Sequence, residues 1–590
     1  MVMTERKIEI IAEIANAHQG DPDQARKLGE QAINAGADAI KFQIYSAEEL
    51  LVQAHSRYQH FKNQAFSPEI WRDLLSYFIL GKQATVYCDV FGLESYEIAR
   101  SADAAGLKIH SSDLGNIPLL ERVAASGKKI FLSCGGSNAR EIATAIKVVG
   151  GKPAKRPILL HGFQSYPTAV EDSCLNRLGW LRKNFGSICD IGYMDHVAGD
   201  DPFATILPLV AIGMGATTLE KHITLNREAK GVDYYSSLNP DDFAHFVKQV
   251  RRCEAAIKSH PEQFAPSEKT YRSQVKKHWV TRSALSAGHV LGRDDLIMKR
   301  VANLDSHAAD INKLLGRPLL HDCPEEHALS RAEVPATVWA LVVARMRSSR
   351  LPGKALLDAA GLPALLHLFE RLKQIKSLDR IVFCTTEEEA DDPLVQLAAG
   401  AGIPFHRGPT DDVLSRMLGA ITNQPVDLIL RVTGDDILVD PDYAQTAIEY
   451  HLSMNAEYSD LKNLPSGTEV EIFDATLLKN IHYLAQDTGG TEYLTFYITH
   501  QKDQFATTIV PVAERHKRDW RLTLDTVEDY EVIKTFLAAM RAEGKALNYC
   551  LDDIVDFFSA RPEVLEKNAM VRQRQAPIEV TTAINWSKFL

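Results

Sequence analysis

The chain of 590 residues lacks several features that would place it in common protein classes. No apolar run approaches the ~20 residues that a membrane-spanning helix needs, so we expect no membrane partner. Basic residues do not prevail, because the net charge is −11, which argues against nucleic acid as the main partner. The first residues contain no signal-peptide core and lead straight into a predicted strand, which favours a cytoplasmic protein.

The eight cysteines form no Cys-x-x-Cys pair; they stand at positions 88, 134, 174, 189, 253, 323, 384 and 550. This scatter indicates neither a disulfide framework nor a zinc ribbon. The contents of hydrophobic residues (45%) and charged residues (24%) are ordinary for a globular protein. The chain is too long for one hydrophobic core, so we expect two large domains and a small one.

Short apolar segments alternate with helical patterns over about the first 260 residues, which is typical of βα units with a parallel sheet. The predicted strands are residues 9–15, 38–44, 84–90, 107–111, 129–134, 158–163, 190–196 and 217–223. Amphipathic segments such as 22–35 and 172–185 lie between them. Eight such units predict an α/β fold of the (β/α)8, or TIM-barrel, type for residues 1–262.

Polar side chains fall in the second half of these strands or just beyond them: Glu13, Lys41, Gln43, Asp89, Lys108, Ser111, Ser133, His161, Asp195, His196, Glu220 and His222. A single polar residue at a strand end is often a satisfied core residue. Polar residues at seven or eight strand ends instead predict an active site, because catalytic groups of such barrels gather at the carboxyl-terminal face.

These groups divide by chemistry. Lys41 and Lys108, with Ser133, suit a phosphate and a carboxylate. His196 and His222 end adjacent strands and suit a divalent metal, although two such histidines are equally often structural. The candidate acid–base or hydroxyl-binding carboxylates are Glu13, Asp113 and Asp233.

Six ordered segments carry a family resemblance: residues 11–20 (IAEIANAHQG), 37–43 (ADAIKFQ), 108–113 (KIHSSD), 166–168 (YPT), 192–196 (GYMDH) and 220–222 (EKH). They resemble the sialic acid synthase family, which condenses phosphoenolpyruvate with an open-chain amino-sugar aldehyde to give a 3-deoxy-nonulosonic acid. Gln164 stands where many relatives have Asn, which is closer to the spore-coat-polysaccharide branch and leaves the sugar open.

The resemblance implies roles for the strand-end residues. His196 and His222 would bind Mn²⁺ or Mg²⁺, which polarises the sugar aldehyde. The implied substrate-binding residues are Lys41, Lys108 and Ser133 for phosphoenolpyruvate, with Gln43, Ser111, Gln164 and Arg300. The implied catalytic residues are Glu13, Asp113, Tyr166, Asp195, Glu220 and Asp233.

A polar stretch with Pro261 and Pro266 predicts a linker, followed by short strands and turns over residues 278–300. Residues 275–332 resemble the small β-rich antifreeze-protein-like (SAF) domain that closes sialic acid synthases. The resemblance implies a homodimer in which this domain covers the partner's barrel and lends Arg300 to the substrate. The family's Pro-Gly after that arginine is absent here, and a surface arginine beside a strand is the alternative.

A second α/β pattern occupies residues 336–590, with predicted strands at 337–344, 380–385, 428–433 and 470–473. We expect a doubly wound, Rossmann-like sheet that binds its ligand at the carboxyl edge of the strands. The first strand runs into a loop that suits a polyphosphate, since arginine and lysine bind phosphate oxygens and glycine lets the backbone approach. The candidate nucleotide-binding residues are Arg345, Ser348, Ser349, Arg350 and Lys354.

Two acidic positions complete this predicted site. Asp435 follows a strand in the segment Thr433–Asp436, and Asp525 follows the segment RLTL. Two carboxylates from distant segments suit the Mg²⁺ of a nucleotidyl transfer, whereas either alone is more often a cap or turn residue.

Residues 337–535 resemble cytidylyltransferases that activate 3-deoxy-ulosonic acids, again of the spore-coat-polysaccharide type. The resemblance implies that the loop binds CTP while Asp435 and Asp525 hold Mg²⁺. Two segments depart from the family on the acceptor side: residues 465–467 (PSG) lack an arginine, and residues 491–495 (TEYLT) lack the usual Arg-Glu-His start.

The sequence therefore predicts a bifunctional enzyme with small-molecule substrates, which makes a nonulosonic acid and then activates it as a CMP-sugar. Two alternatives remain open. The C-terminal half is a non-catalytic binding or dimerisation module, or the synthase uses a shorter sugar and gives an eight-carbon acid.

Overall fold

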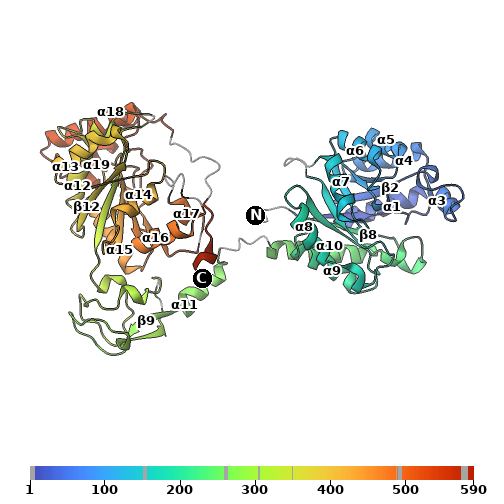
Figure 1. Ribbon diagram of the computed structural model, residues 1–590, viewed down its shortest axis with the longest axis horizontal. Coiled ribbons are helices and arrows are strands. Elements are labelled where there is room, and N and C mark those ends of the chain that lie inside the picture. Colours follow the sequence, from blue (N-terminus) through green and yellow to red (C-terminus); the bar gives the residue numbers. More distant parts are fainter. Residues whose placement is uncertain are drawn as a thin grey trace. The chain divides into compact units, whose positions relative to one another are not determined.

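A computed structural model describes residues 7–150, 156–257, 263–302, 304, 306–348, 350–486, 488, 494–501, 503–572 and 582–589 (Figure 1). These residues form two compact units that divide between positions 259 and 260. Within the described ranges, no helix combines the length and the apolar character that crossing a membrane requires.

The first unit is a closed barrel of eight parallel strands in sequential order. The strands are β1 (Glu9–Glu13), β2 (Ala39–Ile44), β3 (Val86–Val90), β4 (Gly106–Ile109), β5 (Lys129–Ser133), β6 (Ile158–His161), β7 (Asp190–Asp195) and β8 (Thr218–His222). All eight predicted strands are confirmed, with ends within two residues of the predicted ends. The predicted α/β barrel is correct.

Helices cover the outside of the barrel (Figure 1). They are α1 (Pro22–Asn34), α4 (Pro68–Ser76), α5 (Leu93–Ser101), α6 (Ile117–Ala125), α7 (Ala139–Val149), α8 (Asn176–Phe185), α9 (Phe203–Gly213) and α10 (Pro240–Ile257), with the short α2 (Ala47–Leu50) and α3 (Tyr58–Gln64) after β2. Helix α1 begins where the Asp21 carboxylate accepts the amides of Asp23 and Gln24, which fixes its start.

Alternation along the strands separates two apolar layers. One cluster fills the barrel interior and consists of Ile11, Ala39, Tyr87, Phe131, Ile158, Leu160 and Met194. The intervening residues pack outward against the helices in a second cluster. Because side chains of a strand alternate, residues two positions beyond the interior cluster also face inward, at the carboxyl-terminal mouth.

The second unit begins with α11 (Pro266–Val275) and a small domain. Its two-stranded antiparallel sheet pairs β9 (Lys277–Thr281) with β10 (Leu296–Arg300). Its core contains Leu291, Leu314 and Leu329. We call residues 277–334 the middle domain.

A seven-stranded sheet forms the rest of this unit, in the order β13-β12-β11-β14-β16-β15-β17. The strands are β11 (Val338–Val343), β12 (Arg380–Thr386), β13 (Phe405–Gly408), β14 (Leu428–Thr433), β15 (Tyr458–Asp460), β16 (Glu471–Asp474) and β17 (Thr507–Ile509). Strands β11 to β14 are parallel, whereas β16 is antiparallel to both neighbours. The four predicted strands are present, and β13, β15 and β17 were not predicted.

Both faces of this sheet are covered, as the doubly wound prediction requires. One face packs against α12 (Ala364–Leu372), α13 (Asp392–Gly400), α15 (Pro441–Ser453), α18 (Val527–Ala542) and α19 (Leu551–Ala560). The other packs against α14 (Val413–Ala420), α16 (Ala475–Leu484) and α17 (Phe496–Thr499). In β11, Val338 and Val342 belong to the first core and Leu341 to the second.

The middle domain is joined to the seven-stranded sheet by ion pairs. Arg317 donates to both carboxylate oxygens of Asp427, at 2.8 and 2.6 Å, just before β14. Lys313 lies 2.6 Å from Asp474, at the end of β16. The His307 amide donates to the Met454 carbonyl. These contacts make the middle domain part of the second compact unit.

Candidate active sites

Five charged side chains meet, fully or almost fully buried, at the carboxyl-terminal mouth of the barrel. Lys41 contacts Glu13, lies 2.8 Å from Glu220 and lies 3.5 Å from Asp89. Lys108 lies 2.8 Å from Glu220 and 3.4 Å from Asp89. The cluster therefore joins two lysines and three carboxylates from strands β1, β2, β3, β4 and β8.

The charges of this cluster shift its pKa values in opposite directions. Burial raises the pKa of Glu13 to about 7, and Lys41 opposes this rise while Glu220 adds to it. Burial alone would also raise the pKa of Glu220, but Lys108 and Lys41 outweigh it and hold that pKa below its usual range. One carboxyl group thus titrates near neutral pH beside another that stays ionised, an arrangement typical of acid–base sites.

His196 and His222 lie next to this cluster, with 5.4 Å between their ring centroids. The His196 Nδ1 atom is 2.9 Å from the Phe163 carbonyl oxygen, so Nδ1 donates and Nε2 keeps its lone pair. Burial lowers the pKa of His196 to about 4, and burial together with His196 holds the pKa of His222 well below its usual value. Both rings are therefore neutral, as metal ligands must be.

The other predicted barrel residues surround this mouth. The Tyr166 ring contacts the His196 ring in a tilted arrangement, with 4.6 Å between the ring centroids, and its hydroxyl donates to Gln164 at 2.7 Å. Ser133 is buried at the end of β5, with its hydroxyl 3.7 Å from the Met194 sulfur.

The remaining predicted residues of the barrel lie on neighbouring strand ends and loops. Asp233 accepts the Asn16 amide at 3.0 Å just after β1, and burial raises its pKa. Gln43 faces Asp89 in register between β2 and β3. Ser111 and Asp113 lie in the turn after β4.

Asp195 does not join this group. It lies one position after the inward-facing Met194, so its side chain leaves the other side of β7. There it contacts Lys221 and accepts the Tyr193 hydroxyl at 3.0 Å. Asp195 is therefore part of the buried wall between the barrel and its helices. Its side chain does not face the mouth, contrary to the catalytic role expected from the sequence.

In the second unit, the predicted phosphate loop follows β11. Gly434 packs closely against Ala344 at the start of this loop. A side chain would not fit there, because a Cβ atom on Gly434 would lie 2.5 Å from the Cβ atom of Ala344. Arg345 and Ser348 are half-buried in the loop, and the Ser348 hydroxyl accepts the Leu351 amide at 3.4 Å. Ser349 lies outside the described residues.

Lys354 brings the two predicted metal-binding carboxylates together. Its ammonium nitrogen lies 2.6 Å from Asp435 and 3.2 Å from Asp525. Arg350 contacts Asp525 from the same loop, and Arg521 approaches it at 3.3 Å. Asp435 and Asp525 are far apart in the sequence, and a hydrogen bond from the Leu524 amide to the Asp435 carbonyl holds their two segments side by side.

Two further carboxyl groups border this site and were not among the predicted site residues. Burial and the neighbouring Asp435 raise the pKa of Asp436 to about 7. Burial and Asp436 raise the pKa of Glu469 to about 8. Glu469 accepts the amides of Gly467 and Thr468. The only signal for Glu469 in the sequence was its place after the Pro-Ser-Gly turn.

Both predicted metal sites have suitable donors. In the barrel, the Nδ1 atom of His222 is buried without a hydrogen-bond partner, so its ring is not committed to the protein. Two neutral imidazoles would hold Mn²⁺ or Mg²⁺ with water and substrate, since no group of three His, Cys, Asp or Glu side chains in the described ranges is arranged to hold a metal ion. In the second unit, Asp435 and Asp525 already share one cationic group, and carboxylate oxygens suit Mg²⁺.

Comparison with known proteins assigns the two compact units to different families. Residues 28–262 match the NeuB family, and residues 339–557 match the Cytidylyltransferase family. The chain is 30% identical to an N-acetylneuraminic acid (sialic acid) synthetase structure from Leptospira borgpetersenii, covering 46% of this chain and 92% of that one, with a TM-score of 0.41.

Two curated relatives are each similar to part of the chain. An N,N'-diacetyllegionaminic acid synthase from Legionella pneumophila is 28% identical, over 49% of this chain and 85% of the relative. The spore coat polysaccharide biosynthesis protein SpsF from Bacillus subtilis is 30% identical, over 38% of this chain and 94% of the relative. The chain belongs to the NeuB family in its N-terminal part and to the cytidylyltransferase family in its C-terminal part, and so joins a synthase-type transferase to a nucleotidyltransferase.

Proposed function

We propose that the barrel condenses phosphoenolpyruvate with an open-chain N-acyl amino-hexose and that the C-terminal domain converts the product into a CMP-sugar. The observation that carries the first step is the buried lysine–carboxylate cluster beside two neutral histidines. Such a site combines groups that hold a phosphate and a carboxylate with groups that exchange protons and coordinate a cation.

The barrel residues have separate tasks in this reaction. Lys41 and Lys108 bind the phosphate and carboxylate of phosphoenolpyruvate, which then takes the place of their present carboxylate partners. His196 and His222 hold Mn²⁺ or Mg²⁺, which supplies Lewis acidity toward the sugar aldehyde. Glu13 moves a proton, because its pKa of about 7 lets it act in either form at neutral pH.

The chemistry balances without a redox partner. The C3 carbon of phosphoenolpyruvate forms a bond to the aldehyde carbon, water adds to C2, and the bond from C2 to the phosphate oxygen breaks. The products are phosphate and a 3-deoxy-2-keto acid. The negative charge of the cluster stabilises the cationic centre that develops at C2.

The second reaction uses the loop after β11. Arg345, Arg350 and Lys354, with Ser348 and Ser349, bind the phosphates of CTP, and Asp435 and Asp525 hold Mg²⁺. The anomeric hydroxyl oxygen of the sugar acid attacks the α-phosphorus, and pyrophosphate leaves. The keto acid made in the barrel closes to a pyranose that carries this hydroxyl, so the two steps follow in sequence.

The names of the relatives favour a nine-carbon product, since they are synthases of sialic and legionaminic acids. We also propose a homodimer in which Arg300, which is exposed at the end of β10, reaches a partner's barrel. Because phosphoenolpyruvate and CTP are cytoplasmic metabolites, we place the enzyme in the cytoplasm.

A mass-spectrometric assay tests the proposal. The full chain is mixed with phosphoenolpyruvate, CTP, Mn²⁺ or Mg²⁺ and, separately, several 2-acetamido hexoses and a pentose. We expect phosphate, pyrophosphate and a nine-carbon CMP-sugar from one of the hexoses. A free sugar acid without a CMP-sugar would reassign the C-terminal domain as a binding module, and an eight-carbon product would change the substrate.

A further inference from the structure

A polar cavity of about 210 Å³ lies between the middle domain and the seven-stranded sheet. It borders Leu428, the first residue of β14, whereas the loop that holds Lys354 follows the carboxyl end of β11. The cavity is therefore at the opposite edge of the sheet from the nucleotide loop. Neither proposed reaction uses its lining residues.

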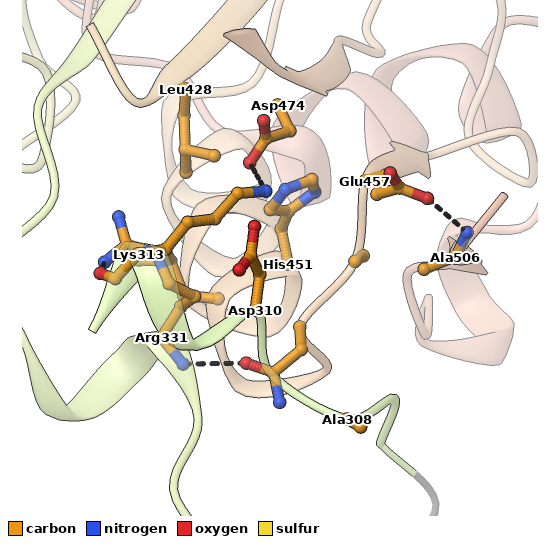
Figure 2. Close-up of a pocket in the computed structure, with 12 residues that line it drawn as sticks. Ala308, Asp310, Lys313, Arg331, Leu428, His451, Glu457, Asp474 and Ala506 are labelled. Atoms are coloured by element: carbon orange, nitrogen blue, oxygen red, sulfur yellow. Dashed lines mark hydrogen bonds and ion pairs between the residues drawn. The ribbon is translucent and has the colours of Figure 1, made fainter. Parts of the chain in front are cut away.

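Charged groups of both domains line this cavity (Figure 2). Asp310, Lys313 and Arg331 come from the middle domain, and His451, Glu457 and Asp474 come from the sheet domain. Figure 2 shows the Lys313 side chain extended toward Asp474, with the His451 ring and Asp310 beside it. The lining thus contains donors and acceptors within a small space.

This lining contains buried polar atoms without a hydrogen bond, among them one on His451. His451 is only 1% exposed, and its Nδ1 atom lies 2.7 Å from the Ser459 hydroxyl. Its Nε2 atom is buried and forms no hydrogen bond. A buried polar nitrogen without a partner is costly, so its place in the wall of a polar cavity indicates that a bound molecule satisfies it.

The size of the cavity limits that molecule. Its volume equals the share of about seven water molecules in the liquid. An apolar cavity of about 150 Å³ holds a benzene ring, so this one has room for a single ring with substituents.

The charges of the lining residues also restrict which molecule can bind. Lys313 and Arg331 supply two positive charges, and Asp310, Glu457 and Asp474 supply three negative ones. Burial lowers the pKa of His451 to about 3, helped by Lys313 and Arg331, so the ring is neutral. Each cation already faces a carboxylate, since Lys313 lies 2.6 Å from Asp474 and Arg331 lies 3.3 Å from Asp427. An anion would therefore find no unpaired cation, and a cation would lie beside two positive charges. Hydroxyl groups, which both donate and accept, match both kinds of lining group.

We propose that this cavity binds a small, neutral, hydroxyl-rich molecule of about one sugar ring, and that the molecule bridges the middle domain and the sheet domain. The ligand hydroxyls contact His451 on the sheet side and Asp310 on the middle-domain side. Its binding stabilises the contact between the two domains, because the site is complete only when they are together.

The test uses saturation-transfer NMR on the full chain with three probes of similar size: the methyl glycosides of glucose, glucosamine and glucuronic acid. They are neutral, cationic and anionic. Because a methyl glycoside is locked as a ring, none can serve as the open-chain substrate proposed for the barrel. We expect saturable binding of methyl glucoside, with the charged probes about tenfold weaker.

Two variants map the binding. His451→Asn keeps a polar group near the Ser459 hydroxyl but removes the Nε2 atom, and we expect about tenfold weaker binding of methyl glucoside. Asp310→Asn keeps the cap on the Asn312 amide and makes the lining neutral. This variant should bind the glucuronide more tightly than the unmodified chain does.

The outcomes decide the proposal. Absence of saturable binding by methyl glucoside would mean that water alone fills the cavity. Preference of the unmodified chain for a charged probe, or binding that His451→Asn leaves unchanged, would also overturn it. The melting temperature and both enzymatic activities of each variant, measured without probe, show whether the variant is folded.

Discussion

Lys354 and Asp435 form an ion pair with 2.6 Å between the ammonium nitrogen and the carboxylate oxygen, and the same nitrogen lies 3.2 Å from Asp525. The lysine thus pairs with both carboxylates that we assign to Mg²⁺. Phosphate groups of a nucleotide would attract Lys354 away from both carboxylates and Arg350 away from Asp525, which would open both carboxylates to the metal at the same time. Nucleotide and metal binding should therefore strengthen each other.

Replacing one of these carboxylates should stop only the second reaction. Asp435→Asn should lower the rate of pyrophosphate release at least about a hundredfold, because one metal ligand is lost, while phosphate release from the barrel stays unchanged. Separate assays of phosphate and pyrophosphate measure this. Asp442→Asn, an exposed acid of α15, is the matched control. Loss of both activities would contradict the assignment of separate sites.

Replacing a histidine of the barrel should have the reverse effect. His222→Ala should abolish phosphate release but leave CMP transfer to a supplied sugar acid intact, since the proposed cation loses one of two protein ligands. His161→Asn is the control, because that ring faces outward and contacts the Ser173 and Cys174 carbonyls. Full condensation activity in His222→Ala would remove the metal assignment.

Asp89 should weaken the binding of phosphoenolpyruvate but stabilise the barrel when no substrate is bound. It is fully buried 3.5 Å from Lys41 and 3.4 Å from Lys108, and its Oδ1 atom has no hydrogen-bond partner. Asp89→Asn removes the excess negative charge of the cluster. We expect about tenfold tighter binding of phosphoenolpyruvate by calorimetry, with about 2 kcal/mol less stability of the barrel.

The control for Asp89 is Asp195→Asn. This variant also removes a buried carboxylate from a lysine, but from the outer wall of the barrel. It should lose stability without any gain in phosphoenolpyruvate binding. Equal gains in both variants would show that the position of Asp89 at the mouth is irrelevant.

Glu13 should make the barrel less stable as the pH rises. Its folded pKa of about 7 lies above its ordinary value of 4.5, so the folded state binds the proton more tightly than the unfolded state. The resulting stability is present below pH 4.5 and is lost as the pH rises through about 7, by on the order of 3 kcal/mol. Glu13→Gln should lack this loss in calorimetry of the barrel transition, and an identical pH slope would contradict it.

Arg317 should hold the middle domain against the sheet. Arg317→Ala removes two hydrogen bonds to Asp427 and leaves that carboxylate with less support. We expect faster hydrogen exchange at the His307 amide, which donates to Met454 across the same contact. Arg293→Ala, at an exposed position of the middle domain, should leave that rate unchanged.

The sequence was sufficient for the barrel because strand ends in such folds collect polar residues. It was less reliable for the direction of each side chain, since a shift of one residue along a strand reverses the face. Asp195 and His196 were adjacent candidates, but only His196 lies at the mouth. Asp89 was recognised as a strand-end residue without a role, because only the folded barrel places it between two lysines.

In the second unit, the loop after β11 could be predicted from the sequence as a phosphate-binding segment, and Asp435 and Asp525 as metal-binding carboxylates. Glu469 could not be predicted as a residue of this site, because it follows a turn and belongs to no motif. It lies near Asp436 because Gly467 packs directly against the Leu522 backbone. The ion pairs of the middle domain were also not predictable, since Arg317 and Asp427 are 110 positions apart and belong to no motif.

The ion pairs of the middle domain decide where the two catalytic halves can be cut apart for recombinant use. A cut after residue 335 would remove the middle domain from the nucleotidyltransferase, and Asp427 and Asp474 would then lose their ion pairs with Arg317 and Lys313. A cut at positions 258–262 keeps these pairs intact. Transplanting the nucleotidyltransferase onto another synthase therefore means carrying the middle domain with it.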